Sequence, residues 1–353
     1  MNCLLEKEEF QIIRCPECKG HLVPYSNNIN CTNCNITFPV IDNIPIFSNT
    51  DAYYGEIKKE NMQNLITESN TIGYKEALKN YINDPWVINY ILNEGRAKWH
   101  ELLELNDDKF ILDIGCGWGT NSIPISKRSK RVYSLDATYE RVKFVQIRVN
   151  QEHIKNITPI MASAVKLPFD SNCFDVVAFN GVLEWLGAID QNVEPIVFQI
   201  KALEGAYKIL KPGGIIYIGI ENRLNLKYFL GEPDDHSSLR FTSLMPRKIA
   251  NIYCSIIKGE KYYMHTYTYK KYLKLLNTFG YCNIKTFMPW PIYKNPDFII
   301  SLNRKSILSK FAELRQTNIS LRKKLFYNLF SAISYIGLCN YFAPSFCFIA
   351  YKK

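Results

Sequence analysis

Residues 110–120 read FILDIGCGWGT, an apolar run followed by three glycines at every second position. The run FILDI has the composition of a buried strand. Glycine permits a tight turn and lets the backbone approach a ligand closely, and a helix that begins after the turn offers free N–H groups to that ligand. The order of strand, glycine turn and helix therefore predicts a cofactor site at Gly115, Gly117 and Gly119.

The spacing of these glycines distinguishes the motif from the fingerprint of a dinucleotide site. The pattern is G-x-G-x-G, and Thr120 stands where a dinucleotide fingerprint has its last small residue. Asp136 ends the next apolar run, RVYSLD. A carboxylate at the end of a second strand accepts hydrogen bonds from both hydroxyls of a ribose. Asp113, inside the first strand, either faces an amino group of the ligand or orients the loop.

Short β-branched runs alternate with helical stretches from residue 110 to residue 302. This alternation predicts βαβ units and a mainly parallel sheet, which is an α/β fold. The expected strands are FILDIG, RVYSLD, ITPIMA, FDVVAFN, GIIYIGI, CNIKTF and FIISL.

Residues 110–221 resemble the class I S-adenosylmethionine-dependent methyltransferases. The motifs that carry the resemblance are LDIGCGWGT, the acidic end of RVYSLD, the AVKLPF that begins at Ala164, FDVVAFNGVLEW, and LKPGG before the fifth strand. The resemblance implies a seven-stranded, doubly wound, Rossmann-like sheet that binds S-adenosyl-L-methionine.

The same resemblance assigns roles to single residues. Gly115, Gly117 and Gly119 would line the methionine and ribose portion of the cofactor, and Asp136 would hold the ribose. Ser163 and Ala164 would meet the adenine, although the family usually has an acidic residue where this chain has Ser163. Asp113 and Asn180 complete the expected cofactor site.

Two CxxC pairs, Cys15/Cys18 and Cys31/Cys34, stand near the N-terminus. Two such turns that face each other supply four sulfurs in tetrahedral directions, which is the geometry of a closed structural zinc site. A unit this small buries little core, so the metal would contribute much of its folding energy. Rubredoxin-like iron and a metal-free fold are the alternatives. The segment CPECKGHL…CTNCNITFPVIDNIPIF resembles the zinc-ribbon family of small proteins that activate tRNA methyltransferases, and this implies a small β-rich zinc ribbon.

The acceptor of the methyl group is expected where strands four and five end, because ligands of open α/β sheets bind beyond the carboxyl ends of the strands. Glu184 and Glu221 follow these strands, and an insertion of roughly residues 223–268 comes next. In the insertion two carboxylates precede His236, and an acid–His pair is typical of an oriented general base. We expect His236 to be catalytic, with Glu184 and Glu221 as the next candidates.

Several alternatives stay open around these residues. Asp234, Asp235 and His236 are also a candidate divalent-cation site or a polar loop contact. His265 lies among tyrosines that either stack on a ring-shaped acceptor or form one face of a strand. Arg96, on a helix before the first strand, either faces a carboxylate of the cofactor or forms a surface ion pair with a neighbouring glutamate such as Glu94.

The chain divides into four parts by composition and motif. They are a zinc-ribbon domain at 1–49, a helical linker and cofactor-covering helix at 50–108 with a start signal at Asp84-Pro85, a methyltransferase domain at 109–302, and a basic helical extension at 303–353 that ends in the strand SFCFIAY.

Composition excludes several classes of protein. The chain has 353 residues, of which 47% are hydrophobic and 22% charged, so it is too apolar to be disordered. The charged N-terminus MNCLLEKEEF argues against a signal peptide, and eleven cysteines without one fit a reducing compartment, so we expect a cytoplasmic protein. Residues 325–351 are interrupted by polar residues and proline, which favours a packed helix over a membrane span and leaves peripheral membrane contact open.

Charge is unevenly spread and suggests an anionic partner. Of the net charge of +10, residues 303–353 contribute +8, from nine Lys/Arg and one Glu. We expect methyl transfer to an O or N atom of a small-molecule or saccharide-containing biosynthetic intermediate, and the uneven charge suggests that this intermediate is anionic. An RNA base methyltransferase is the alternative, although residues 1–110 are net acidic and Asn180 begins NGVL rather than an Asn/Asp-Pro-Pro motif. A non-catalytic adaptor whose ribbon docks a partner is the third.

Overall fold

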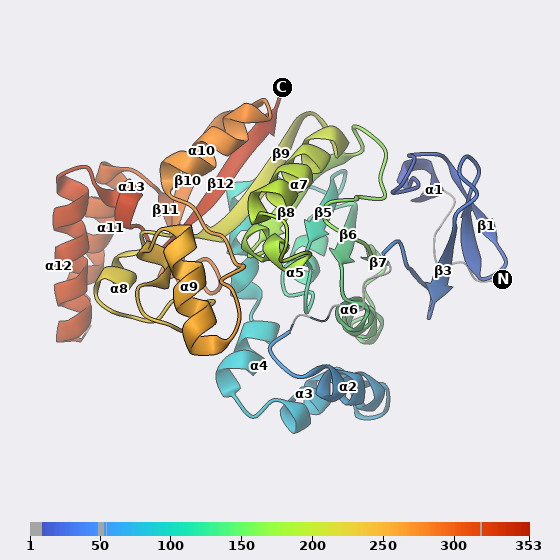
Figure 1. Cartoon of the computed structure of the whole chain (residues 1–353), viewed down its shortest axis with the longest axis horizontal. Helices are drawn as coiled ribbons and strands as arrows, with labels where there is room; N and C mark the ends of the chain where they lie inside the picture. Colours follow the sequence, from blue (N-terminus) through green and yellow to red (C-terminus); the bar gives the residue numbers. More distant parts are fainter. Residues whose placement is uncertain (1–8, 49–52, 54, 318–319) are drawn as a thin grey trace. The chain divides into compact units, whose positions relative to one another are not determined.

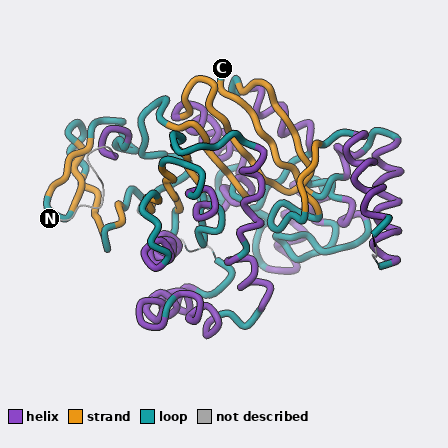
Figure 2. Tube along the Cα trace, turned by 180° about the vertical axis from the view of Figure 1, so that it is seen from behind, coloured by secondary structure: helices purple, strands orange, loops and turns teal. Residues whose placement is uncertain are grey.

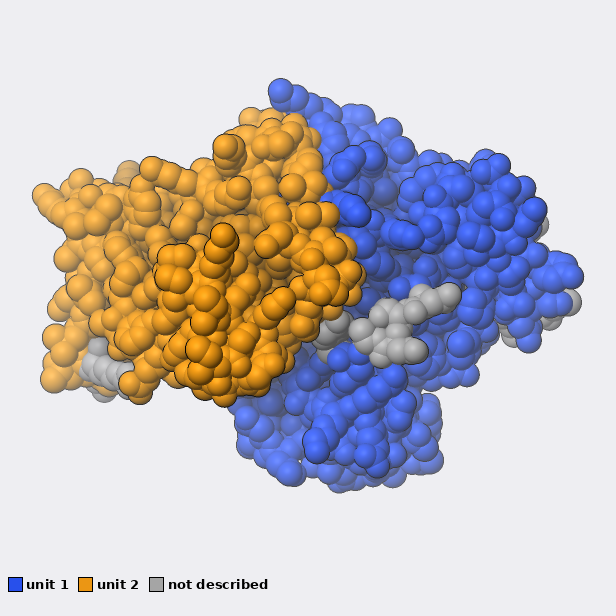
Figure 3. Space-filling model, in the orientation of Figure 1, with its two compact units in different colours: residues 1–179, 201–216, 352–353 blue, residues 180–200, 217–351 orange. Residues whose placement is uncertain are grey.

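The computed structural model describes residues 9–48, 53, 55–317 and 320–353. Residues 1–8, on which most of the expectation about a signal peptide rests, lie outside the described residues. The chain forms two compact units, which Figure 3 colours separately: unit 1 comprises residues 1–179, 201–216 and 352–353, and unit 2 comprises residues 180–200 and 217–351. The four-part division made from the sequence stays a prediction.

Unit 1 begins with a small antiparallel sheet of order β1-β2-β3-β4. The β-rich character predicted for this segment is therefore confirmed. Its elements are the short helix α1 (Glu9–Ile12) and the strands β1 (Leu22–Tyr25), β2 (Asn28–Cys31), β3 (Thr37–Ile41) and β4 (Ile44–Pro45).

Three helices and a 3-10 helix follow the small sheet in unit 1. The predicted helix start is present, because the Asp84 carboxylate accepts a hydrogen bond from the Trp86 backbone N–H and Pro85 occupies the first turn. Asn93 has extended backbone angles and ends this helix. The elements are α2 (Lys59–Ile72), α3 (Tyr74–Tyr81), α4 (Pro85–Leu92) and η1 (Glu94–Leu102).

The large sheet has the order β11-β10-β12-β9-β8-β5-β6-β7. Strands β5 to β8 pair in parallel, and β10 and β11 pair antiparallel, so the α/β fold is confirmed with a mixed sheet. The strands are β5 (Phe110–Ile114), β6 (Arg131–Asp136), β7 (Ile157–Met161), β8 (Phe174–Asn180), β9 (Leu210–Glu221), β10 (Tyr281–Trp290), β11 (Phe298–Ser301) and β12 (Ser345–Lys352). The predicted seven becomes eight among the described residues, because SFCFIAY pairs inside the sheet in addition to FIISL.

Helices complete both units, as Figures 1 and 2 show. In unit 1, α6 packs against β6 and β7. In unit 2, α11 and α12 pack together, and the tyrosine-rich segment between α9 and α10 is irregular rather than a strand. These helices are α5 (Ser122–Ser126), α6 (Tyr139–Gln151), η2 (Leu183–Ala188), α7 (Pro195–Ile209), α8 (Leu226–Phe229), η3 (Thr242–Leu244), α9 (Arg247–Lys258), α10 (Tyr269–Thr278), α11 (Arg304–Arg315), α12 (Leu321–Tyr335) and α13 (Cys339–Phe342). Over the described part of the chain, every helix falls short of the length and hydropathy that crossing a bilayer requires.

Candidate active site

The glycine loop after β5 needs glycine for its backbone. Gly115, Gly117 and Gly119 have φ of 68°, 53° and 77°, the left-handed region that other residues adopt at a cost. The space beside Gly117 is open, since a Cβ there would meet no atom nearer than the Gly115 carbonyl oxygen at 4.0 Å. A ligand can therefore approach the Gly117 backbone closely.

Asp136 ends β6 directly beside this loop. Its Oδ2 accepts a hydrogen bond of 3.0 Å from the Gly117 backbone N–H, and its Oδ1 accepts one of 3.0 Å from the Thr138 N–H. Burial raises the pKa of this carboxyl, and the backbone N–H groups oppose that rise. The residue is partly exposed, and two backbone N–H groups fix the orientation of its carboxylate.

The next strand brings the remaining cofactor candidates of unit 1 to the same edge. Asp136 is paired in register with Met161 of β7, and the Ala162 N–H donates to the Asp136 carbonyl. Ser163 follows, and its Oγ accepts a hydrogen bond from the Val165 N–H at 3.4 Å. Because β5, β6 and β7 are parallel neighbours, the loops after all three strands lie at one edge of the sheet.

Asp113 lies behind the loop. It is 1% exposed, and its Oδ2 accepts a hydrogen bond of 2.6 Å from Ser122 Oγ, which in turn accepts one from Ser134. Burial raises the pKa of Asp113 to about 6. Of the two roles left open by the sequence, this placement favours orienting the loop. Its other oxygen is buried without a partner among the described residues.

Residues of the segment before α2, of α4 and of α6 contact the glycine loop. The Trp118 indole N–H donates to Glu56 Oε2 at 2.9 Å, and Glu56 also pairs with Arg141, whose guanidinium lies 4.1 Å from the centre of the Trp118 ring. Thr120 Oγ1 donates to the Ile91 carbonyl at the end of α4. The loop is therefore preorganised by contacts that its own motif does not reveal.

Arg96 lies with its guanidinium 4.1 Å from the centre of the Tyr90 ring. Glu94, one of the expected partners of Arg96, instead pairs with Lys127 at 2.8 Å. Arg96 contributes positive charge near Asp113, where it opposes the rise in the pKa of that carboxyl.

The four cysteines predicted to bind metal come together. Cys15 Sγ lies 3.7 Å from Cys34 Sγ, Cys18 Sγ lies 3.4 Å from Cys31 Sγ, and all four sulfurs are within 4.8 Å of one another. Four sulfurs at about 2.3 Å from a tetrahedral zinc lie roughly 3.8 Å apart, so the donor set fits this ion. Backbone N–H groups of Gly20 and Asn33 point at Cys18 and Cys31, as expected for thiolates.

The cysteine-bearing sheet packs against β7 and α6 of unit 1. Ile46 forms a parallel bridge to Met161 of β7, and Ile44 and Ile46 share a core cluster with Val142 and Met161. At the opposite end of the segment, Arg14 forms an ion pair of 2.6 Å with Asp170. This segment therefore supports the strand and helix beside the cofactor edge.

Unit 2 brings the three predicted catalytic residues together. Ligand atoms of Glu184, Glu221 and His236 all lie within 4.8 Å of one another, although the residues come from η2, the end of β9 and the insertion. Their side chains are nearly inaccessible: Glu184 is 0% exposed, and the side chains of Glu221 and His236 are 1% and 2% exposed. Trp185 packs edge-on against His236 with ring centres 5.4 Å apart.

Two further residues of unit 2 complete this cluster. Lys294 Nζ lies 2.7 Å from Glu221 Oε1, and the Tyr293 hydroxyl donates to Glu221 Oε1 at 3.0 Å and to Glu184 Oε1 at 3.3 Å. We call these five residues, Glu184, Glu221, His236, Tyr293 and Lys294, the carboxylate–histidine cluster.

The two carboxyls of the cluster have pKa values shifted in opposite directions. Burial, and then the charge of Glu221, raise the pKa of Glu184 to about 8. Burial also opposes ionisation of Glu221, but Lys294 and His236 outweigh it and hold the pKa of Glu221 well below its usual value. Burial lowers and Glu221 raises the pKa of His236, with a net rise. Paired carboxyls with separated pKa values are typical of sites that move protons.

The carboxylates next to His236 in the sequence are not its partners. Asp234 is buried and accepts hydrogen bonds from the His236 and Ser237 N–H groups and from Tyr262, so it shapes the turn. Asp235 pairs with Lys227 at 2.7 Å. Of the alternatives left open, Asp234 and Asp235 therefore form polar contacts within the loop. The acid–His pair expected from these neighbours was wrong, because His236 instead faces Glu184 and Glu221.

Asn180, the last cofactor candidate, belongs to unit 2. Its Oδ1 accepts a hydrogen bond of 3.2 Å from the Tyr217 hydroxyl. A Cβ at Gly219 would lie 2.2 Å from this oxygen, and one at Gly181 would lie 2.6 Å from the Tyr293 hydroxyl. These two glycines therefore leave room for the polar side chains between them.

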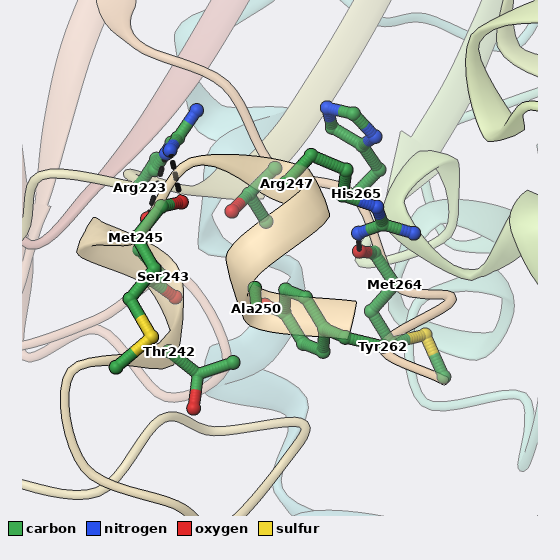
Figure 4. Close-up of a pocket in the computed structure, with 10 residues that line it drawn as sticks. Arg223, Thr242, Ser243, Met245, Arg247, Ala250, Tyr262, Met264 and His265 are labelled. Atoms are coloured by element: carbon green, nitrogen blue, oxygen red, sulfur yellow. Dashed lines mark hydrogen bonds between the residues drawn. The ribbon is translucent and has the colours of Figure 1, made fainter. Parts of the chain in front are cut away.

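A small pocket with a cavity volume of about 20 Å³ also lies in unit 2 (Figure 4). Arg223 donates to the Ser243 and Met245 carbonyls on one side of it, and Arg247 donates to the Met264 carbonyl on another. Burial and the nearby arginines lower the pKa of His265 to about 3, so this imidazole is neutral. Its backbone N–H donates to the Glu184 carbonyl, which links the pocket wall to the carboxylate–histidine cluster.

Tyr293, Lys294 and Glu56 contact candidate site residues but were not predicted from the sequence. Tyr293 and Lys294 follow β10, so their position after a strand is the signal that could have identified them. Glu56 carries no local signal, because its partners Trp118 and Arg141 are distant in the sequence.

Comparison with known proteins is consistent with this geometry. Residues 112–218 match the family model described as a methyltransferase domain. The chain is 27% identical over 130 residues to the mitochondrial ubiquinone biosynthesis O-methyltransferase of Rattus norvegicus, covering 34% of this chain and 33% of the relative. It is 32% identical over 111 residues to a probable cobalt-precorrin-6B C(15)-methyltransferase (decarboxylating) of Methanococcus maripaludis, covering 31% of this chain and 61% of the relative.

The matches to curated relatives are partial, since the chain spans 33% of the first relative and 61% of the second. Among solved structures, phosphoethanolamine N-methyltransferase 2 of Haemonchus contortus in complex with S-adenosyl-L-methionine has a TM-score of 0.43 and 15% identity, with 82% of this chain and 60% of that chain covered.

Proposed function

We propose that this chain, whose residues 112–218 are a class I S-adenosylmethionine-dependent methyltransferase domain, transfers a methyl group to an O or N atom of a small-molecule or saccharide-containing biosynthetic intermediate. The observation that carries the cofactor part is the open glycine loop bonded to Asp136 at the edge formed by β5, β6 and β7. When bound, S-adenosyl-L-methionine supplies an electrophilic methyl group. The residues that would hold it in unit 1 are Gly115, Gly117, Gly119, Asp136, Ser163 and Ala164, with Asp113 behind the loop.

Methyl transfer from a sulfonium is an in-line displacement, so the protein contributes position, exclusion of water and, for a hydroxyl or ammonium acceptor, removal of a proton. In this proposal the carboxylate–histidine cluster of unit 2 receives that proton. Its support is that His236 and two carboxylates are buried together and that each has an atom without a hydrogen-bond partner among the described residues.

A small-molecule acceptor is supported by the names of the two relatives, which specify ubiquinone biosynthesis and a cobalt-precorrin. RNA and a non-catalytic adaptor are the competing functions. We also keep peripheral membrane contact as a proposal for the C-terminal region, where α12 exposes Leu321, Leu325 and Leu329.

Replacing His236 by glutamine tests the catalytic part. The His236→Gln variant is expected to bind S-adenosyl-L-methionine normally in calorimetry and to transfer methyl groups roughly 10²–10⁴-fold more slowly to the acceptor identified by screening hydroxylated and amino metabolites with labelled cofactor. Glu232→Gln, at an exposed residue of the same loop, is the matched control. Unchanged turnover in His236→Gln would reassign His236 to loop structure. Cofactor binding with no transfer to any acceptor class would favour the adaptor.

A further inference from the structure

The carboxylate–histidine cluster holds four buried atoms that lack a hydrogen-bond partner among the described residues. They are Glu184 Oε2, Glu221 Oε2, and both Nδ1 and Nε2 of His236. Buried polar atoms in proteins are nearly always satisfied, and a group of exceptions points to an ion, a water molecule or a ligand that completes them. All five residues of the cluster belong to unit 2, so their geometry is internal to one unit.

The spacing of these atoms fits the ligands of one cation. His236 Nε2 lies 3.8 Å from Glu221 Oε2, which is too long for a hydrogen bond. Two ligand atoms that each lie about 2.0–2.2 Å from a common ion are separated by roughly 3–4 Å. One ligand atom from each of Glu184, Glu221 and His236 lies within 4.8 Å of the other two, so a small adjustment brings the three around an ion.

The neighbours of the cluster leave the required oxygens available. Lys294 and Tyr293 both bind Glu221 Oε1, and Tyr293 also donates to Glu184 Oε1. The Oε2 atoms of both carboxylates are left without such donors.

We propose that Glu184, Glu221 and His236 bind a divalent transition-metal cation. An imidazole nitrogen with two carboxylate oxygens suits Mn²⁺, Fe²⁺ or Zn²⁺, whereas Mg²⁺ and Ca²⁺ prefer all-oxygen sites. Three protein ligands are fewer than the four that a zinc ion takes in proteins, so one coordination position would remain for another oxygen. This consequence rests on the proposed function: a hydroxyl bound to the ion would lose its proton more readily than a free one.

Titration of the full-length protein with Mn²⁺, followed by electron paramagnetic resonance of the free ion, tests the site without cofactor or acceptor. Mn²⁺ is the probe because it has little affinity for the four thiolates that suit zinc. We expect one ion to bind per chain, and Glu184→Gln, Glu221→Gln and His236→Gln each to weaken binding at least tenfold. Glu232→Gln and the Cys31→Ser/Cys34→Ser double variant are controls that should retain it.

Different results would contradict the metal site and the proposed methyl transfer. Absence of Mn²⁺ binding to the wild-type protein, with methyl transfer intact, would overturn the metal site and leave a proton as the occupant of the cluster. Binding that persists in all three glutamine variants would place the ion elsewhere and also overturn it. Mn²⁺ binding without methyl transfer would uphold the site and contradict the proposed function. Circular dichroism identifies a variant that fails to fold, and the other two variants then decide.

Discussion

At the scale of single residues, the cofactor candidates of unit 1 and the carboxylate–histidine cluster of unit 2 are held in place by different kinds of contact. The cofactor candidates are held by backbone: Asp136 accepts two main-chain N–H groups, and Gly117 needs its positive φ. The carboxylate–histidine cluster is held by side chains: Lys294 and Tyr293 bind Oε1 of Glu221, and Tyr293 also donates to Oε1 of Glu184. Backbone contacts tolerate little change of conformation, so substitutions among the cofactor candidates of unit 1 should act on cofactor binding.

Gly117→Val and Asp136→Asn test the cofactor candidates of unit 1. Valine at a φ of 53° is strained and fills the open space beside the loop, so S-adenosyl-L-methionine binding should be lost. Asparagine keeps the shape of Asp136 but removes charge-assisted hydrogen bonds to the ribose, each worth about 1.5–3 kcal/mol at most. Isothermal titration calorimetry measures both effects.

Gly213→Val is the matched control for the strain. Gly213 also has a positive φ, 74°, with no atom within 4 Å of an added Cβ, and it lies outside the glycine loop. Its variant should lose a similar free energy of unfolding and keep cofactor affinity. Equal affinity in wild type, Gly117→Val and Asp136→Asn would contradict the assignment of the loop.

At the scale of elements, the cysteine-bearing sheet is a support rather than a separate module. β4 and the residue after it pack on β7 and α6, which lie next to the strand that ends in Asp136. The sheet is small, so its own core contributes little and a bound metal would determine whether the support forms.

Removal of two thiolates is expected to abolish metal binding and to destabilise unit 1. In the Cys31→Ser/Cys34→Ser variant, zinc measured by mass spectrometry should fall from one ion per chain to none, and thermal unfolding should begin at a lower temperature. Cys282→Ser is the control, because Cys282 belongs to unit 2 and is not one of the four clustered cysteines, and serine can still donate to the Tyr351 carbonyl. Zinc retained at one ion per chain in the double variant would show that another site holds it.

At the scale of the whole molecule, charge distinguishes the two classes of acceptor. Nine of the 43 Lys/Arg residues fall in residues 303–353, against a single acidic residue there. A nucleic acid bound by this region would release counterions from its phosphates, and its affinity would fall steeply with salt. A small acceptor would show little such dependence.

We therefore expect turnover to change little between low and physiological salt. Lys323→Ala/Lys324→Ala, which neutralises two exposed residues of α12, should leave turnover and its salt dependence unaltered. A loss of activity of 10³-fold or more over that range, reduced in slope by the double variant, would instead indicate RNA. Methylation assays at several salt concentrations measure this directly.

The sequence alone determined the parts of this protein that depend on local backbone. A glycine turn after an apolar strand, Asp136 at the end of the next strand and two CxxC pairs each carry their own signal, because φ angles and short spacings are properties of neighbouring residues. Only the tertiary structure decided the partners of His236, since Glu184, Glu221 and Lys294 are far apart in the sequence. It also decided that β12 pairs inside the sheet, that Asp234 accepts a hydrogen bond from the Ser237 N–H and that Asp235 pairs with Lys227. Burial and the pairing of distant charges are non-local quantities, and no window of sequence contains them.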